Sequence, residues 1–475
     1  MDSTTYASPF SWRYGRAELR SLFSEETRRR LWRAVWVALA EAQAAEGLVA
    51  EAEVADLCAH AHDIDIEAAL EIEREIHHDL MAEIRVFASQ AKVGGAKLHL
   101  GATSMDIEDT VETYRLRVAL AYIGASLQDL LRAFAEKIRE YANLTCMAFT
   151  HLQPAEPTTL GYRLAVYAQD LTIDDAALRF TFENLTTKGL RGAVGTAASY
   201  EHLLDGSGKS ANIEAYVLQK FGLAAREIST QTYPRKLDYM LLSALAGLGA
   251  SLSKFAADVR ILSSPEFGEV SEPFGKSQVG SSAMPFKRNP ILCERIDSLA
   301  RLLAGYSEVA WQNAATNFLE RTLDDSANRR TILPEAMLCA DEIVSLAMRV
   351  IKGLRVNERR IAHNLRTYGP FAGTEAVMME AVRSGGDRQK LHETIRSAAM
   401  QAWEALARGE DNPLSQLLAE DRDLTSRIDP AEIRRLLDPG KHVGTAPQRA
   451  LLLADDIERL EPFPRQTEIT LGDTK

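Results

Sequence analysis

The sequence predicts an all-α protein whose centre is a bundle of long helices. Apolar residues recur in alternating steps of four and three from Leu116 to Ile138, and again from Leu241 to Leu262. Such spacing places the apolar side chains on one stripe of each helix, where they pack against neighbouring helices. No segment shows a convincing alternation of β-branched and polar residues, which strands would need. A chain of 475 residues is longer than a domain with a single hydrophobic core usually is, which favours several domains around this bundle.

The elements follow one another along the chain as three helical regions. They are an N-terminal domain over 1–103, a central bundle over 104–356 and a C-terminal domain over 357–475. Further bundle helices are expected over 296–310 and 334–354, with Pro334 as a helix-start proline. The bundle helices are too long and apolar for one chain to cover, which favours self-association.

The composition argues against several classes of protein. A formal net charge of −12 and a pI near 5.5 disfavour a nucleic-acid binder, so an anionic substrate would need locally clustered Arg and Lys. The four cysteines are scattered without a CxxC pair, which is typical of a reduced compartment. The first residues lack the apolar core of a signal sequence, and charges interrupt the most apolar helix. We therefore expect a cytoplasmic protein with no nucleic-acid or membrane partner.

One short segment combines several chemically active side chains. Residues 280–290 are GSSAMPFKRNP, and Glu294 and Arg295 follow. The preceding residues, from Ser263 to Ser282, are rich in Gly, Ser and Pro, which disfavours a helix and favours a mobile lid. A hydroxyl group beside a cation and an amide suits carbanion formation next to a carboxylate. By composition alone, a solvated turn fits equally well.

Other polar segments interrupt the helical periodicity at distant points of the chain. They are Arg13-Tyr14, His77-His78-Asp79, residues 101–104 (GATS), 150–154 (THLQP) and 320–330 (ERTLDDSANRR). The adjacent histidines His77 and His78 do not face one another on a helix, so a metal site is not expected. His151 lies at a predicted helix break, which favours function modestly over the usual structural role of a lone histidine. Taken alone, residues 320–330 fit a solvated helix face better than a binding site.

The order and spacing of these segments resemble the adenylosuccinate lyase family of the fumarase/aspartase superfamily. The similar segments are RY, HDLMA, HLGATS, THLQPA, QTYPRKLD, GSSAMPFKRNP and LERTLDDSANRR, the last with Leu319 where the family has Phe. The GSSxMPxKxNP motif is shared with argininosuccinate lyase, aspartase, fumarase and carboxymuconate cycloisomerase. QTYPRKLD and RTLDDSANRR resemble the adenylosuccinate branch, particularly the type found in animals and some bacteria.

The resemblance implies a fold, an assembly and a reaction. It implies three all-α domains and a homotetramer in which three subunits build each site. The implied enzyme is a carbon–nitrogen lyase of purine biosynthesis, which eliminates fumarate from adenylosuccinate to give AMP and from SAICAR to give AICAR. No cofactor or metal is implied, because the nitrogen departs by proton transfer alone.

The catalytic residues of the family correspond to five positions of this chain. Ser281 matches the general base and His151 the general acid that protonates the departing nitrogen. Lys287 is implied to offset the dianionic aci-carboxylate, and such a donor is typically worth ~3–4 kcal/mol. Glu294 is implied to hydrogen-bond His151, and His78 to support the reacting centre.

The remaining matched positions are implied to bind the substrate. The phosphate and ribose ligands would be Arg13, Tyr14, Arg321, Ser326 and Arg330, since Arg suits phosphate through its bidentate fork. The succinyl carboxylates would contact Thr103, Ser104 and Gln231. Thr150, Asn289 and Arg295 would line the same site, with Asn289 supporting Lys287, and His77 and Asp79 would flank His78.

The sequence departs from the family pattern at three positions. His77 stands where the family often has Arg, Glu83 stands where a histidine is common, and Phe286 replaces a more polar aromatic residue. These departures bear on substrate affinity more than on reaction type.

Two other functions compete with this interpretation. A lyase for argininosuccinate or a carboxymuconate would not need the phosphate ligands Arg13, Arg321 and Arg330, because those substrates carry no phosphate. A non-catalytic scaffold, like the lens crystallins related to argininosuccinate lyase, would need neither Ser281 nor His151. The adenylosuccinate lyase interpretation is therefore favoured.

Overall fold

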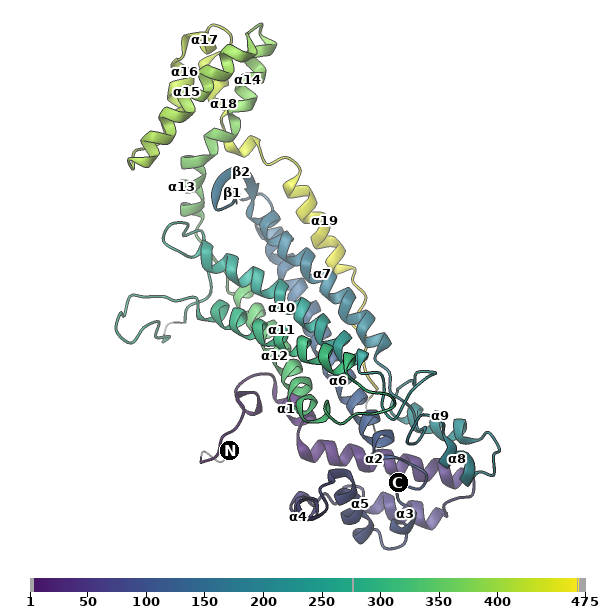
Figure 1. The fold of residues 1–475 in the computed structure, drawn as a ribbon. Helices are drawn as coiled ribbons and strands as arrows, with labels where there is room; N and C mark the ends of the chain where they lie inside the picture. The colour runs from purple at the N-terminus through teal and green to yellow at the C-terminus, as the bar shows by residue number, and fades with distance from the viewer. Residues whose placement is uncertain (1–3, 276, 468, 470–475) are drawn as a thin grey trace.

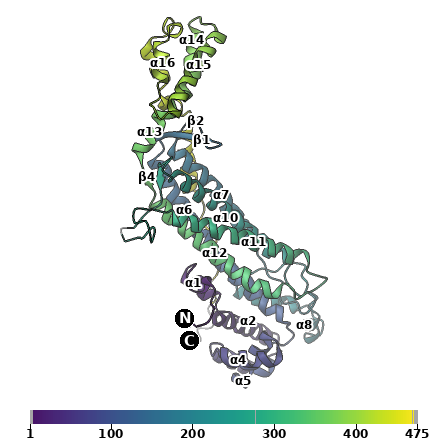
Figure 2. The ribbon, with the colours of Figure 1, turned by 60° about the vertical axis from the view of Figure 1, so that its left-hand side comes forward.

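The computed structural model describes residues 4–275, 277–467 and 469 as an elongated, mainly helical molecule (Figure 1). It is 66% helix and 4% strand, which confirms the predicted all-α class. Two views show the same order of parts, with N-terminal helices at one end, a long bundle in the middle and C-terminal helices at the other end (Figure 2).

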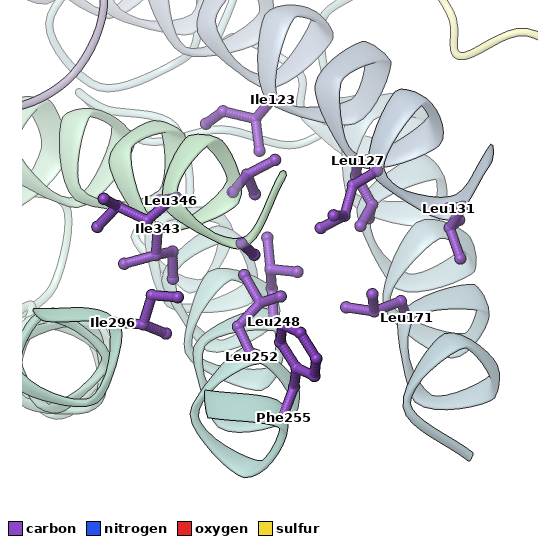
Figure 3. Close-up of a cluster of buried hydrophobic side chains, with 14 of the residues drawn as sticks. Ile123, Leu127, Leu131, Leu171, Leu248, Leu252, Phe255, Ile296, Ile343 and Leu346 are labelled. Atoms are coloured by element: carbon purple, nitrogen blue, oxygen red, sulfur yellow. The ribbon is translucent and has the colours of Figure 1, made fainter. Parts of the chain in front are cut away.

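Five long helices form the bundle: α6 (Ser104–Glu140), α7 (Leu160–Asn184), α10 (Lys236–Leu262), α11 (Ile291–Ala315) and α12 (Ser326–Lys352). Their apolar stripes meet in one core, where Leu127, Leu171, Leu248 and Ile343 point toward one another (Figure 3). Each such side chain contributes roughly 1.5–3 kcal/mol by its burial. By length and apolarity α6 and α10 would each pass as membrane spans, but their stripes are buried among the other bundle helices.

A second core lies at the N-terminal end of the bundle and is built around Trp32, Trp36 and Phe87. The helices of this region are α2 (Glu25–Ala45), α3 (Glu51–His60), α4 (Ile66–Ile76), α5 (Asp79–Gln90), η2 (Gly95–Lys97), α8 (Ala198–Leu203) and α9 (Ser210–Lys220). The short helices η1 (Pro9–Ser11) and α1 (Ala17–Leu22) pack on the bundle core instead, through Phe10 and Leu19. The beginning of α6 packs into the same core through Ile107 and Val111, so the bundle and this region share a helix.

A third core lies at the opposite end and contains Leu391, Leu418 and Ile433. The elements of this region are α13 (Glu358–Tyr368), η3 (Gly369–Gly373), α14 (Thr374–Arg383), α15 (Arg388–Ala407), α16 (Leu414–Glu420), α17 (Arg422–Thr425), α18 (Pro430–Leu436) and η4 (Pro439–Lys441). The last helix, α19 (Ala446–Glu458), packs instead on α6 and α7 of the bundle. The predicted domain division stays a prediction, and its last range, 357–475, includes 468 and 470–475, which lie outside the described residues.

Four short strands accompany the helices, which the sequence pattern does not predict. β1 (Thr145–Thr150) and β2 (Gln153–Thr159) form an antiparallel hairpin, and β3 (Val270–Ser271) pairs with β4 (Arg355–Val356). The predicted helix break at His151 is therefore a hairpin turn. Prolines at 154 and 157 of β2 conceal the alternation that would otherwise indicate a strand.

The prediction that Pro334 starts a helix is wrong. Helix α12 begins at Ser326, and Pro334 lies inside it. A proline within a helix normally costs about 3 kcal/mol because it has no N–H for the carbonyl four residues earlier. The helix continues through this position because its later turns are buried in the bundle core through residues such as Ile343 and Leu346.

Candidate active site

Several predicted binding residues meet where α5, α6 and α12 converge. His78 caps the start of α5, and its Nε2 lies 3.4 Å from the Ser104 hydroxyl on α6. Arg330 of α12 donates a hydrogen bond of 2.7 Å to the carboxylate of the adjacent Asp79. Ser326, on the first turn of α12, lines the same cleft as Arg330. We call His78, Asp79, Ser104, Ser326 and Arg330 the basal cluster.

The start of α6 is held in place by a fully buried ion pair. Asp106 accepts a 3.0 Å hydrogen bond from the Thr103 backbone and pairs with Lys188 at 2.6 Å. The turn before it needs Gly101, whose φ is +77° and whose missing side chain leaves room for the ring of Tyr200. These contacts orient Thr103 and Ser104 toward the basal cluster.

A second buried network lies beneath the cluster and joins two motifs that are distant in sequence. Arg235 of the QTYPRKLD segment donates to Asp325 at 2.7 Å and to Asp109 at 3.1 Å. Asp325 also accepts a 3.0 Å hydrogen bond from Arg321. Burial alone would raise the pKa of Asp325, but the positive charges of the neighbouring arginines keep this pKa below its ordinary value. The network therefore holds the Arg321 guanidinium in place through its hydrogen bond to the ionised Asp325 carboxylate.

Two further contacts extend this network. The Gln231 backbone donates to the Glu320 carbonyl at 3.2 Å, so Gln231 lies next to the predicted phosphate segment. Arg329 donates to Asp238 at 2.7 Å and to the Tyr233 hydroxyl at 2.6 Å. The sequence alone did not assign a role to Arg329, Asp238 or Tyr233. The QTYPRKLD and RTLDDSANRR motifs do contain arginines close to carboxylates, and that pattern could have indicated ion pairs between them.

A cleft of about 120 Å³ opens beside the basal cluster between α2, α6 and α12. Arg28 stands at its edge, 4.0 Å from Asp79 and stacked 4.8 Å from the ring centre of Trp32. Burial would raise the pKa of Asp79, yet Arg330 and Arg28 together hold that pKa below its ordinary value. Glu108 also lines the cleft. Neither Arg28 nor Glu108 lies in a motif that sequence analysis singled out.

The predicted general acid lies far along the bundle, in the β1–β2 hairpin. His151 and Leu152 form a two-residue turn with φ values of 53° and 60°, and Thr150 pairs with Gln153 across it. Positive φ is unfavourable for residues other than glycine and costs of order 1–3 kcal/mol each. Leu152 is 62% exposed and His151 is also exposed, so the turn presents the imidazole to solvent.

The GSSAMPFKRNP segment forms the tip of an exposed loop between β3 and α11. The Ser281 Oγ accepts backbone hydrogen bonds from Ala283 at 3.3 Å and from Met284 at 3.1 Å. The Asn289 side chain closes the loop by donating to the Gly280 carbonyl at 3.0 Å. A side chain at position 280 would lie 2.0 Å from the Lys287 carbonyl, so only glycine fits there.

The start of α11 positions Glu294 and Arg295. The buried Glu272 carboxylate accepts backbone hydrogen bonds from Leu292 and Cys293 at 3.0 Å, which satisfies donors at this helix end. Glu294, in the first turn, is exposed, and Arg295 is half-buried. Glu272 was not assigned from the sequence, because its capping role depends on contact across the loop.

The N-terminal segment lies against α12 beyond the basal cluster. Gly15 and Arg16 donate backbone hydrogen bonds to Glu342 at 3.1 Å and to Asp341 at 2.7 Å. Asp341 lies roughly 16 Å along the helix from Arg330, at about 1.5 Å per residue. Arg13 is exposed, and its guanidinium lies 5.6 Å from the Trp12 ring centre. Tyr14 packs against the bundle core.

The three residues that depart from the family pattern lie in different structural environments. Glu83 is fully buried and forms ion pairs with Arg29 at 3.0 Å and Arg33 at 2.7 Å, so it serves the N-terminal core. His77 ends α4 in the left-handed conformation with φ of 54°. Phe286 is 81% exposed at the loop tip.

One chain does not bring the predicted residues into one place. Figure 1 shows the hairpin beside α13, the loop projecting from the side of the bundle, and α4 and α5 at the opposite end. Among residues 4–275, 277–467 and 469, no hydrogen bond or ion pair joins His151 to Glu294, or either the hairpin or the loop tip to the basal cluster. The residues predicted to bind the substrate, to act as the acid and to act as the base therefore lie in three separate regions of one chain.

Comparisons with known proteins agree with one another over most of the chain. Residues 13–305 match a family model described as "Lyase", and residues 370–450 match one described as "Adenylosuccinate lyase C-terminus". The chain is 34% identical to the adenylosuccinate lyase of Schizosaccharomyces pombe (97% of each chain) and to that of Saccharomyces cerevisiae (98% of this chain and 97% of the other). It is 35% identical to the enzyme of Archaeoglobus fulgidus over 93% of this chain and 96% of the other.

Solved structures show the same fold. A fumarate lyase from Mesorhizobium sp. BNC1 superimposes with a TM-score of 0.81 at 25% identity, over 95% of this chain and 99% of the other. A 3-carboxy-cis,cis-muconate lactonizing enzyme from Pseudomonas putida gives 0.82 at 25% identity, over 94% and 99%.

Proposed function

The chain belongs to the adenylosuccinate lyase family of the fumarase/aspartase superfamily, and from this premise we propose how its residues carry out the reaction. The reaction is the elimination of fumarate from adenylosuccinate, giving AMP, and from SAICAR, giving AICAR, in purine biosynthesis. The observation that carries this function is the buried network that holds QTYPRKLD and RTLDDSANRR together beside the basal cluster.

Ser281 is the general base. Its oxygen removes a proton from the carbon next to one succinyl carboxylate, and that carbon's electron pair passes into the carboxylate to give a dianionic intermediate. The backbone N–H groups of Ala283 and Met284 already point at this oxygen and stabilise negative charge on it. Lys287 is exposed nearby and offsets the charge of the aci-carboxylate.

His151 is the general acid. As the electron pair returns to form the double bond of fumarate, the carbon–nitrogen bond breaks and the nitrogen takes a proton from the imidazole. The strained, exposed hairpin turn supports this role, because it holds the imidazole away from its own chain. Glu294 orients His151, and His78 supports the reacting centre.

The basal cluster and its surroundings bind the substrate. Arg321, Ser326 and Arg330 hold the phosphate and ribose together with Arg13 and Tyr14. The succinyl carboxylates contact Thr103, Ser104 and Gln231, and the remaining contacts come from Thr150, Asn289, Arg295, His77 and Asp79. No metal or cofactor enters these steps, because each one is a proton transfer or a change at carbon.

Each complete site is built by more than one copy of the chain, within a homotetramer. Support comes from the positions of the hairpin, the loop and the basal cluster, which lie on separate parts of one molecule (Figure 1). Neighbouring chains packed side by side along their bundles would bring these regions together. A cytoplasmic location stays a prediction.

Fumarate release from adenylosuccinate tests the reaction, with AMP identified by chromatography and argininosuccinate as the control substrate. Formation of fumarate and AMP, absent for argininosuccinate, is the expected result. Activity on argininosuccinate alone would keep the elimination chemistry and contradict the phosphate site. Inactivity on both substrates would contradict the proposed function.

Mixing two inactive variants tests the shared site. Ser281→Ala and His151→Ala, denatured together and refolded as a mixture, should regain a fraction of activity, because some sites then receive both an intact base and an intact acid. Each variant refolded alone is the control and should stay inactive. No recovery in a mixture that forms tetramers would contradict sharing of the site between chains.

A further inference from the structure

The cleft beside the basal cluster contains an acid to which the proposed mechanism gives no role. Glu108 lies on α6 four residues after Ser104, so both project from the same face of the helix. It lines the cleft together with Ser326 and Arg330. Within the part of the chain that the structure describes, its carboxyl group makes no hydrogen bond and no ion pair, so it is free to contact a ligand.

Charged groups face Glu108 from every helix around the cleft. They are Asp79 of α5, Glu25 and Arg28 of α2, Arg329 and Arg330 of α12, and Asp109, Glu112 and Arg115 of α6 itself. Most of these are already paired: Arg330 with Asp79, Arg28 with Glu25, Arg115 with Glu112 and Arg329 with Asp238. The carboxyl group of Glu108 therefore has no cation of its own.

Burial, reinforced by the negative charges of Asp79 and Asp109, raises the pKa of Glu108 to about 8, although Arg28 and Arg330 oppose the rise. At pH 7 the group is thus mainly neutral. A neutral carboxyl group donates one O–H, whereas an ionised one only accepts.

We propose that Glu108 is a specificity residue for the substrate phosphate, donating a hydrogen bond to a phosphate oxygen held by Ser326 and Arg330. This inference rests on the proposed function, because it takes those two residues as phosphate ligands. An ionised carboxylate in this position would repel the phosphate dianion and compete with it for Arg330. Phosphate binding and protonation of Glu108 are therefore coupled.

The coupling has a distinct kinetic signature. For a group of pKa about 8, KM should rise about tenfold between pH 7 and pH 9, because the binding-competent neutral fraction falls by that factor. The contact is the same in the ground state and the transition state, so kcat should not share this rise. Titration of the catalytic groups affects all variants alike and cancels when their KM values are compared.

The test compares KM and kcat for adenylosuccinate from pH 6.5 to 9.5 in the wild-type tetramer, Glu108→Gln and Glu136→Gln. Glu136 is exposed on the same helix and controls for the loss of one charge. Glu108→Gln keeps a neutral donor, so its KM should stay near the wild-type value at pH 7 and lose the alkaline rise. Glu136→Gln should follow the wild type. An alkaline rise in Glu108→Gln equal to that of the wild type would overturn the proposal.

Calorimetric titration with AMP separates this proposal from the proposed function, because it needs no turnover. Wild-type affinity for AMP should fall about tenfold from pH 7 to pH 9, and Glu108→Gln should remove that fall. A wild-type enzyme that binds AMP in this way but does not release fumarate would contradict the proposed reaction and leave the phosphate contact supported. If Glu108→Gln does not fold, Glu108→Ala provides the test, with weaker AMP binding at pH 7 and no pH dependence; pH-dependent binding in that variant would overturn the proposal.

Discussion

The network under the basal cluster and the loop that carries Ser281 are built in opposite ways. Arg235, Asp109 and Asp325 are buried and form ion pairs with one another within a single chain. Ser281 is half-buried and Lys287 is exposed, and the loop tip is held mainly by hydrogen bonds within the loop itself. In the proposed mechanism, the binding region is thus preorganised before substrate arrives, whereas the loop that carries Ser281 must close on the substrate.

This difference has a physical basis. Buried charges are stable only in a fixed geometry, because an unpaired charge in a low-dielectric interior is costly. A base must reach its substrate and exclude water when it acts, and lids of this kind typically move between open and closed states. A variant in the network should therefore change stability first, and a variant in the loop should change rate first.

The largest expected effect is on turnover, in Ser281→Ala. Loss of the proposed general base should lower kcat about 10³–10⁴-fold without changing the melting temperature, because the hydrogen bonds of the hydroxyl, within the described part of the chain, stay inside its own loop. Fumarate absorbance and thermal unfolding measure the two quantities. The matched control is Ser282→Ala, which removes the neighbouring hydroxyl; an equal loss of kcat there would contradict the assignment of Ser281.

The next effect is on stability, in Asp109→Ala. Removal of Asp109 leaves the buried Arg235 with only the Asp325 carboxylate, which Arg321 shares, and breaks the hydrogen bond from the Tyr233 backbone; this should cost about 3–5 kcal/mol of unfolding free energy. Urea unfolding measures the loss. Asp129→Ala, on the same helix, removes an exposed partner of Arg132 and should cost less than about 1 kcal/mol. Equal costs in the two variants would show that the network is not a stabilising element.

A smaller effect is expected at the boundary between the two regions, in Arg321→Ala. Loss of a charge-assisted contact with phosphate should raise KM roughly 10–100-fold with kcat little changed. Steady-state kinetics on adenylosuccinate measure this split, and Arg383→Ala, an exposed arginine of α14, is the control. An unchanged KM in Arg321→Ala would remove Arg321 from the phosphate site.

The smallest effect is a pH-dependent gain in stability for Glu108→Gln. The folded-state pKa of about 8 lies above the ordinary value of 4.5, so the folded wild type binds an extra proton between these pH values. Its stability therefore falls as pH rises from 4.5 to 8. The variant avoids this loss and should be more stable than the wild type at pH 9, with no pH-dependent difference below pH 4.5. Thermal unfolding at pH 4 and pH 9 measures this, and a gain that is the same at both pH values would contradict it.

The sequence by itself determined the fold class, the main helices and the family. The apolar stripes from Leu116 to Ile138 and from Leu241 to Leu262 lie in α6 and α10, because helical periodicity is a local property of the chain. The comparisons confirm the family indicated by the order of the motifs. The site assignments drawn from those motifs stay predictions.

Tertiary structure alone decided the properties that depend on distance and burial. The hairpin at His151 forms although prolines conceal β2, and α12 runs through Pro334 because its later turns are buried in the bundle. Arg235 and Asp325 meet across a separation of 90 residues, and Glu108 titrates near pH 8 only because helices distant in sequence enclose it. Ion pairs and shifted pKa values arise from the dielectric surroundings and the charges within a few ångströms, and a sequence pattern carries neither.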